Sequence, residues 1–467
     1  MKVYNTLTRQ KEELVTLTPG KVGIYACGPT VYNLIHIGNA RPICVFDVLR
    51  RYLESKGLDV TYVQNFTDID DKIINRANAE GVTYKEIAET YIAEYRTDAA
   101  GLNVRPATVH PRATENIDEI LSIIETLIEK GYAYEAGGDV YFSPSKFPEY
   151  GKLSHQPPED LMSGARINVG ELKREPMDFA LWKASKPGEP AWESPWGPGR
   201  PGWHIECSAM SRRYLGRTVD IHCGGQDLIF PHHENEIAQS ECCNGVPFAR
   251  YWMHNGFITV DKEKMSKSKG NFFTVRDVAQ QFGYRAIRML MLSCHYRSPI
   301  NYSFEAIEHC KTSLERLTTC RDSMDFVLKT AGAGEKPADL ENALADFRVR
   351  FDEALADDLN TADAIAVFFE LVSYINKNLL TDTPDRDSIL AAKAVYDAFN
   401  AVLGIVYDEP TQEKTDEDAA EIEALIAERT EARKAKDWAR ADAIRDRLTA
   451  MGVVLEDTKQ GVKWRRV

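Results

Sequence analysis

The sequence predicts an α/β fold, in which a parallel sheet is followed by a helix bundle and a small C-terminal domain. A buried strand at Val22–Ala26, a helix from Ala40 to about Lys56 and a second strand at Val60–Phe66 form one short strand–helix–strand unit. Such a unit needs a right-handed crossover, so its two strands are parallel. Between residues 275 and 403, apolar residues recur at spacings of three and four, which predicts helices packed as a bundle. A chain of 467 residues is also too long for one core.

A long insertion interrupts the sheet pattern. Helices are expected at about 83–100 and 114–130, and Tyr132–Phe142 is expected to form a hairpin that turns at Gly137–Gly138. From Ser143 to Gly202, proline and glycine are frequent and no long helix is expected. We therefore interpret residues 114–202 as the insertion.

The sheet pattern resumes at Trp203. The segment WHIECSAMSRRYLG predicts a helix, and Thr218–Cys223 predicts a strand with the glycine-rich exit GGQDL. Pro231 lies near the start of a further helix, HHENEIAQSECC, and Tyr251–Val260 is a strand or a pair of strands. The bundle helices are expected near 304–328, 344–355, 362–379 and 388–403.

Composition narrows the class of protein. A hydrophobic content of 43% is typical of a globular protein, no apolar run is long enough to span a bilayer, and MKVYNTLTRQ lacks the core of a secretory signal. Nine cysteines, two of them adjacent, do not form a disulfide framework, so we expect a reducing cytoplasm with free thiols or metal ligands. The net charge of −14 argues against a non-specific nucleic-acid coat.

The charge reverses its sign near the C-terminus. Residues 407–428 carry nine acidic side chains against one lysine, whereas residues 429–467 carry eleven Lys or Arg against six Asp or Glu. The tail is expected to form a helix, a short helix, a turn and a ribbon. A basic run is commonly a solvated helix surface, but Trp438 and Trp464 among the arginines favour RNA contact, because aromatic rings stack on bases.

The stretch from Val22 to Arg41 contains a candidate nucleotide site. Its strand leads through a loop with Cys27 and Pro29 into a helix start with the sequence HIGN. Unpaired N–H groups and the helix dipole favour an anion at such a start, and glycine permits close approach. From these residues alone, a capping or core-edge role for His36 is an equal alternative.

The segment KMSKS, residues 264–268, is a second candidate. Lys264 and Lys267 follow a strand and suit a triphosphate, because two cations neutralise the charge that develops as pyrophosphate leaves. Alone, the segment is an ordinary lysine-rich loop. The order HIGN, glycine-rich turn, KMSKS is far more specific.

Candidate metal ligands are spread along the chain. Cys27 ends a strand at the edge where open α/β sheets bind ligands, and Cys207 lies in the helix that resumes the fold. The remaining candidates are His232 or His233 and Glu234 or Glu236. Two thiolates, an imidazole and a carboxylate are a set that suits Zn²⁺. Buried free cysteines are the alternative interpretation.

In combination, these motifs resemble those of the cysteinyl-tRNA synthetases, a family of class I aminoacyl-tRNA synthetases. The resemblance runs essentially from end to end and is carried by HIGN, NFTDIDDK, WHIECSAM, FPHHENEIAQS, KMSKS and ARKAKDWARADAIRDRL. It implies a Rossmann-like catalytic domain with halves at 1–113 and 203–260 and a connective insertion at 114–202. It also implies a KMSKS loop and stem-contact region at 261–303, a helix bundle at 304–406, and an acidic linker with a basic anticodon-binding domain at 407–467.

The resemblance also implies the site residues. The implied zinc ligands are Cys27, Cys207, His232 and Glu236. ATP, accompanied by Mg²⁺, is expected to contact Pro29, His36, Gly38, Asn39, Gly224, Gly225, Asp227 and Lys267, and the expected catalytic groups are His36, Lys264 and Lys267. The substrate cysteine is expected at Cys27, Gly28, Thr67 and Trp203, and tRNA at Arg433, Lys436, Trp438, Arg440, Trp464 and Arg465.

Two of these residues carry their own qualifications. Trp203 either walls the amino-acid pocket or belongs to the core. The family's motif commonly ends in a second histidine where this chain has Asn39. An asparagine donates a hydrogen bond but carries no charge, so electrostatic stabilisation is expected from His36 alone.

The implied activity is ATP-dependent ligation of cysteine to its tRNA through cysteinyl-adenylate, in a cytoplasmic monomer. Zinc would select the substrate thiol over the hydroxyl of serine. A cysteine ligase that acts on an amino sugar in thiol biosynthesis would share the zinc and ATP motifs but would not use the basic tail. A non-catalytic zinc-containing RNA-binding paralogue would not need intact HIGN and KMSKS segments.

Overall fold

A computed structural model describes residues 1–156, 172–260, 263–264, 272–408, 416–451, 453–458 and 461–466. The chain forms two compact units. Unit 1 comprises Met1–Leu314, Val349–Ala366 and Asn400–Ile405, and unit 2 comprises Glu315–Arg348, Val367–Phe399 and Val406–Val467.

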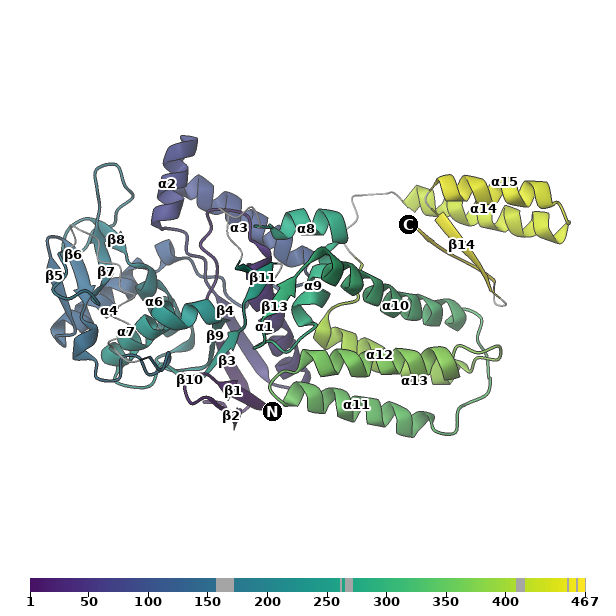
Figure 1. Ribbon diagram of the computed structural model, residues 1–467, viewed down its shortest axis with the longest axis horizontal. Coiled ribbons are helices and arrows are strands. Elements are labelled where there is room, and N and C mark those ends of the chain that lie inside the picture. Colours follow the sequence, from purple (N-terminus) through teal and green to yellow (C-terminus); the bar gives the residue numbers. More distant parts are fainter. Residues whose placement is uncertain are drawn as a thin grey trace. The chain divides into compact units, whose positions relative to one another are not determined.

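A parallel four-stranded sheet lies at the centre of unit 1 (Figure 1). In spatial order its strands are β10 (Ala249–Asn255), β9 (Val219–Gly225), β3 (Lys21–Ala26) and β4 (Asp59–Gln64). Because β3 pairs in parallel with both β4 and β9, the segment that ends at Cys27 lies in the middle of the sheet. The predicted parallel sheet and its strand–helix–strand unit are confirmed.

Helix α1 (Ile37–Ser55) is the crossover between β3 and β4 and is buried over most of its surface. It begins three residues before the start expected from the sequence. The reason is local, since the Asn39 side-chain oxygen accepts the N–H of His36 at 3.1 Å and closes the first turn there.

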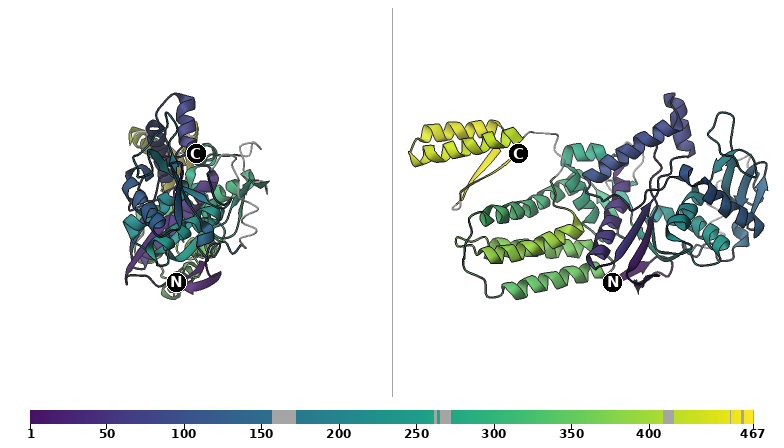
Figure 2. Two further views of the ribbon diagram at one scale, coloured as in Figure 1. Left: turned by 90° about the vertical axis from the view of Figure 1, so that its left-hand side faces the viewer. Right: turned by 180° about the vertical axis from the view of Figure 1, so that it is seen from behind.

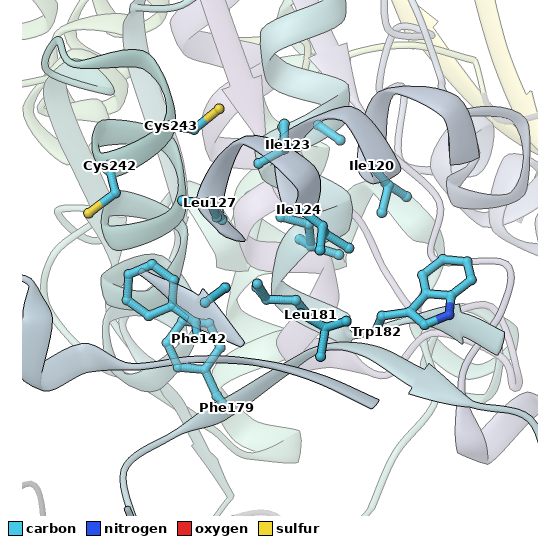
Figure 3. Packing of buried hydrophobic residues seen from close by; sticks show 14 of the residues in the cluster. Ile120, Ile123, Ile124, Leu127, Phe142, Phe179, Leu181, Trp182, Cys242 and Cys243 are labelled. Atoms are coloured by element: carbon cyan, nitrogen blue, oxygen red, sulfur yellow. The ribbon is translucent and has the colours of Figure 1, made fainter. Parts of the chain in front are cut away.

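The insertion carries a sheet of its own. Strands β5 (Ala133–Ala136), β6 (Asp139–Phe142), β7 (Phe179–Ala184) and β8 (Gly199–Pro201) are antiparallel neighbours in that order. The expected hairpin turn is present, and both of its glycines have positive φ. Isoleucines at three- and four-residue spacing on α4 (Ile117–Glu129) pack with Phe142 and Leu181 of this sheet, as Figure 3 shows.

Two helices join this core to the central sheet. They are α6 (Trp203–Leu215) and α7 (Glu234–Asn244), and both contribute residues to the cluster in Figure 3. Helix α7 begins later than the sequence suggested. The segment Ile229–His233 forms an irregular turn with a cis peptide at Phe230–Pro231, so His232 lies before the helix rather than on it.

The remaining elements of unit 1 flank the sheet. The helices are α2 (Asp71–Glu80), α3 (Tyr84–Gly101), α8 (Val275–Phe282) and α9 (Tyr284–Leu292). Strands β1 (Lys2–Asn5) and β2 (Gln10–Glu13) form a hairpin, and β12 (Glu263–Lys264), β11 (Ile258–Val260) and β13 (Ile300–Tyr302) form a third sheet. The segment 251–260 thus contains two strands, which belong to different sheets.

Four long helices run side by side in Figures 1 and 2, and each contributes part of its length to unit 2: α10 (Phe304–Leu328), α11 (Leu340–Ala356), α12 (Thr361–Asn378) and α13 (Arg386–Leu403). Their inner faces meet through aromatic pairs such as Phe368 with Tyr396, whose ring centroids lie 4.7 Å apart. The expected helix bundle is confirmed.

The C-terminal segment of unit 2 forms a small helix pair and a ribbon. Helix α14 (Asp416–Lys434) and α15 (Trp438–Ala450) pack with β14 (Val453–Thr458), which pairs antiparallel with β15 (Gly461–Arg466). A compact apolar cluster holds them together, formed by Ile422, Leu425, Ile444, Leu448 and Val453.

Candidate active site and metal centre

The candidate site lies at the carboxyl edge of the central sheet. Cys27 directly follows β3, Asn65 directly follows β4, and Gly224 and Gly225 end β9. In a parallel sheet these ends share one edge, and ligands of open α/β proteins bind there. Three segments far apart in the sequence therefore meet at one place.

Four predicted ligands meet at this edge. The Sγ atoms of Cys27 and Cys207 lie 3.9 Å apart, and Glu236 Oε1 lies 3.5 Å from Cys27 Sγ and 3.0 Å from His232 Nε2. One ligand atom from each of these four residues lies within 4.8 Å of the others. Zinc bound tetrahedrally to two sulfurs, at about 2.3 Å from each, would hold them about 3.8 Å apart. The donor set and its spacing therefore fit Zn²⁺.

The structure decides between the two glutamates of HHENE. The Glu234 carboxylate accepts backbone N–H groups of Gly151, Leu153 and Ser154 at 2.8–3.1 Å and is buried. It therefore fastens the turn that follows the β5–β6 hairpin. Glu236 points instead toward the two cysteines, which makes it the carboxylate of the metal candidate.

The two histidines of HHENE also have different surroundings. His233 Nε2 lies 3.3 Å from Cys27 Sγ, and its Nδ1 lies 2.8 Å from Nε2 of His254. His222 Nε2 lies 2.8 Å from Glu236 Oε2, so Cys27, His222, His233 and Glu236 form a second, overlapping group. We favour His232, because its group contains both thiols, and we assign His222 and His233 to the layer that orients the ligands.

Charge in the cluster is divided between its members. The hydrogen bond from Cys27, acting against burial, lowers the pKa of Cys207 to about 6, whereas burial and the neighbouring Cys207 raise the pKa of Cys27. Burial opposes ionisation of Glu236, yet the imidazoles of His222 and His232 hold its pKa well below the usual range. A thiolate and a carboxylate are thus available to a cation at neutral pH.

Trp203 covers one side of the cluster. Its ring stacks on His232 with centroids 4.4 Å apart and an angle of 22° between the planes, and 42% of the residue is exposed. Such exposure excludes the alternative in which Trp203 is a core residue. Aromatic side chains are common in the lining of small-molecule pockets.

Gly28 and Thr67 are held by two residues that the sequence did not single out. The Gly28 N–H donates to Asn65 Oδ1 at 2.9 Å, and a Cβ at position 28 would lie 1.6 Å from the Asn65 carbonyl oxygen. Thr67 Oγ1 donates to Glu206 at 2.8 Å, and burial raises the pKa of that carboxyl well above its usual range. Asn65 and Glu206 lie in the motifs NFTDIDDK and WHIECSAM, but the sequence assigned them no role of their own, because each acts through a partner distant in the chain.

The HIGN segment lies against the residues that follow KMSKS. Ile37 N–H donates to the carbonyl of Phe273 at 3.1 Å, and Val275 N–H donates to the carbonyl of Ile35 at 2.9 Å. The His36 ring meets Phe272 edge-on, with centroids 5.3 Å apart. Lys264 lies in β12, whereas Lys267 lies outside the described residues.

The glycine-rich exit of β9 is tightly packed. A Cβ on Gly224 would lie 3.0 Å from a ring carbon of His233, and a Cβ on Gly225 would lie 2.3 Å from Asp227 Oδ1. Asp227 itself is exposed, beside the glycines. The Asp227 carboxylate therefore lies beside glycine backbone that carries no side chain, and such a carboxylate can accept hydrogen bonds from ribose hydroxyls.

Comparison with known proteins agrees with this geometry. Three family models match: "tRNA synthetases class I (C) catalytic domain" at residues 13–312, "DALR domain" at 350–407, and "Cysteinyl-tRNA ligase anticodon binding domain" at 415–465. The cysteine–tRNA ligase of Clostridioides difficile (strain 630) is 56% identical over 470 residues, which cover 100% of both chains. The chain belongs to the cysteinyl-tRNA synthetase family.

Other relatives give the same result. The cysteine–tRNA ligase of Caldicellulosiruptor saccharolyticus is 53% identical, again over 100% of both chains. Methionyl-tRNA synthetase of Mycobacterium tuberculosis, solved in complex with methionyl-adenylate, superposes with a TM-score of 0.61 at 17% identity and covers 82% of this chain and 90% of its own. That likeness shows the class I fold. As a member of the cysteinyl-tRNA synthetase family, the chain is an aminoacyl-tRNA synthetase, and neither alternative function is favoured.

The predicted tRNA contacts of this family member lie in its C-terminal segment. Arg433, Lys436, Trp438 and Arg440 are exposed around the start of α15, and 59% of Trp438 is accessible. Arg440 already pairs with Glu428 at 2.7 Å. Trp464 and Arg465 lie on β15, and their side chains lie outside the described part of the chain.

Among the described residues, no helix is long and apolar enough to cross a membrane.

Proposed function

We propose that this chain attaches L-cysteine to its cognate tRNA in two steps. The cysteine carboxylate attacks the α-phosphorus of ATP, and the bond to the β-phosphate oxygen breaks to release pyrophosphate. A hydroxyl of the terminal adenosine of the tRNA then attacks the carbonyl carbon of cysteinyl-adenylate and releases AMP. Neither step needs a covalent enzyme intermediate, since positioning and charge neutralisation suffice.

The observation that carries the proposal is the cluster of Cys27, Cys207, His232 and Glu236 beside the nucleotide edge of the sheet. When bound, Zn²⁺ would supply a Lewis acid that accepts a thiolate sulfur far more readily than the oxygen of serine. The four side chains would hold such an ion, and Trp203 would limit the space beside it. A missing methylene would give only about 1–3 kcal/mol of discrimination, whereas a metal–sulfur bond separates the two amino acids without an editing site.

The chain's own residues would position ATP and its departing pyrophosphate. At the start of α1 the N–H groups of Ile37 and Asn39 donate to the carbonyls of Phe273 and His36, so the N–H that would face phosphate is that of Gly38. The Asn39 side-chain nitrogen would also donate, because its Oδ1 accepts His36 N–H. His36, Lys264 and Lys267 would meet the charge that develops on the triphosphate, with Mg²⁺ accompanying ATP. Asp227 would hold the ribose hydroxyls.

We infer that the reaction takes place in the cytoplasm and that the chain acts as a monomer, since all four candidate metal ligands come from one chain. All nine cysteines are free thiols, which fits a reducing compartment. The exposed cations and Trp438 around the start of α15 would bind the anticodon.

The test of this proposal replaces Cys207 with serine. We expect Cys207→Ser to lose bound zinc, measured by elemental analysis, and to lose cysteine-dependent ATP–pyrophosphate exchange. Cys320→Ser is the matched control, since Cys320 is a buried thiol of the helix bundle, outside both metal groups. Unchanged exchange in a Cys207→Ser protein that holds no zinc would refute the role of the metal.

A further inference from the structure

A cavity of about 410 Å³ lies in unit 1 beside the outer strand of the central sheet. It is enclosed by α1, β4, α3 and the segment 104–110. None of its lining residues is assigned above to ATP, cysteine, metal or tRNA. Its volume is within the range of about 300–1,000 Å³ that small-molecule sites occupy.

The walls of the cavity are apolar. Ile43, Tyr62, Ala99 and Val104 contribute much of the lining. The polar groups among them are engaged with each other, since Tyr95 Oη donates to Gln64 Oε1 at 2.5 Å and His110 Nδ1 lies 2.9 Å from the Gln64 carbonyl. These contacts occupy part of the polar lining, and the apolar remainder suits a hydrocarbon or aromatic body.

Positive charge surrounds this apolar interior. Arg50, Arg96 and Arg105 line it from three separate elements. Glu54 forms salt bridges with two of them, at 2.8 Å from Arg50 Nε and 2.6 Å from Arg105 Nη1. Arg96 is exposed and makes no hydrogen bond or salt bridge with any residue in the described part of the chain.

The one acidic lining residue does not cancel this charge. Asp47 is buried and is already bound to Arg51 at 2.8 Å and to Arg288 at 2.7 Å. Asp47 and Glu54 are thus bound to Arg51, Arg288, Arg50 and Arg105, and Arg96, which lies near Glu89, is the lining cation that makes no salt bridge with a described residue. The surplus of cations around an apolar cavity favours an occupant that carries negative charge.

We propose that this cavity is a second ligand site, which binds a small molecule with an aromatic body and one anionic group. The body fills the space between Tyr62 and Ala99, and the anion meets Arg96 with Arg50 and Arg105 beside it. The site is separate from aminoacylation and does not depend on the function proposed above.

A fluorescent probe of the same chemistry tests the proposal. The probe is 1-anilinonaphthalene-8-sulfonate, titrated into the full-length protein at saturating ATP so that the nucleotide site is occupied. We expect one ATP-resistant binding event, which Arg96→Glu weakens by about tenfold or more because a charge-assisted contact is lost. Ala100→Phe, which places a ring in the cavity from an exposed lining position, should abolish it.

Lys85→Glu is the matched control. Lys85 is exposed on the same helix, it is not a lining residue, and its replacement changes the net charge by the same amount. Loss of affinity in Arg96→Glu but not in Lys85→Glu supports the proposal. The absence of ATP-resistant binding, or equal affinity in all three variants, overturns it. If Ala100→Phe lowers the melting temperature, the surface variant Arg96→Glu decides.

Discussion

The two glutamates of HHENE give a matched pair of substitutions. Glu234→Gln and Glu236→Gln make the same chemical change two residues apart on α7, yet the structure gives the side chains unrelated partners. We expect Glu234→Gln to lower stability with metal retained, and Glu236→Gln to lose metal.

The size of the first effect follows from the hydrogen bonds of Glu234. Its Oε2 accepts Leu153 N–H at 3.1 Å and Ser154 N–H at 2.8 Å, while Oε1 accepts Gly151 N–H at 2.9 Å. Glutamine keeps one oxygen and turns the other acceptor into a donor that faces N–H groups. With the glutamine oxygen at the Oε2 position, one buried bond to a charged group, that of Gly151, is lost, at about 1.5–3 kcal/mol. For a unit of this size, that loss lowers Tm by about 2–4 °C.

The second effect concerns the metal candidate. Glu236 lies 3.5 Å from Cys27 Sγ and 3.0 Å from His232 Nε2, so a neutral amide there removes an anionic ligand. Loss of an outer partner of a ligand already costs about 10–100-fold in metal affinity, and we expect a larger loss here. Differential scanning calorimetry and zinc content measure both effects. Stoichiometric zinc in Glu236→Gln, or lost zinc with unchanged Tm in Glu234→Gln, would refute the assignment.

Four further predictions follow from single contacts. Trp203→Ala should raise KM for cysteine by about tenfold in pyrophosphate exchange with little change in KM for ATP, because it removes the ring over His232; an equal change in both KM values would contradict this. Gly28→Ala should abolish exchange, since its Cβ would lie 1.6 Å from a backbone oxygen, whereas Gly332→Ala, with nothing within 4 Å, should be silent. Trp438→Ala should raise KM for tRNA in charging assays and leave exchange unchanged; a parallel loss of both would make the residue structural. Burial lowers the pKa of His254 in the folded protein to about 3, against about 6.5 in the unfolded chain. Its contribution to stability is therefore complete above pH 6.5 and is lost as the pH falls toward 3, by up to about 1.4 kcal/mol per pH unit. His254→Gln should flatten that slope in denaturant titrations at several pH values, and an unaltered slope would show that other groups dominate.

Local patterns were sufficient for much of the fold. The helix at Tyr84–Gly101 begins where Thr83 and Glu86 exchange hydrogen bonds, and a segment of four residues is enough to predict that arrangement. The β5–β6 hairpin likewise follows from two adjacent glycines that adopt positive φ. The start of α7 was misplaced because the turn at Ile229–His233 has no local signature beyond Pro231.

The site was predicted less completely than the fold. HHENE offers two histidines and two glutamates, and their spacing alone does not say which of them approach Cys27. The turn after the β5–β6 hairpin packs onto α7 and directs Glu234 away from Cys27, because the backbone N–H groups of Gly151 and Ser154 donate to its carboxylate. His222 and His254 lie on β9 and β10, and they join the cluster only because those strands are neighbours.

By itself, the sequence determined the parallel sheet, its insertion, the helical bundle and the order of the motifs, because helix and strand periodicity, caps and turns act over a few residues. The tertiary structure decided which side chains share a site, since strand order and helix packing bring together Cys27, Cys207 and Glu236 across 209 residues of chain. It also decided the cavity at Arg96, which exists only because α1, β4, α3 and the segment 104–110 meet there. Contacts between distant segments depend on the packing of the whole chain, and no local pattern encodes them.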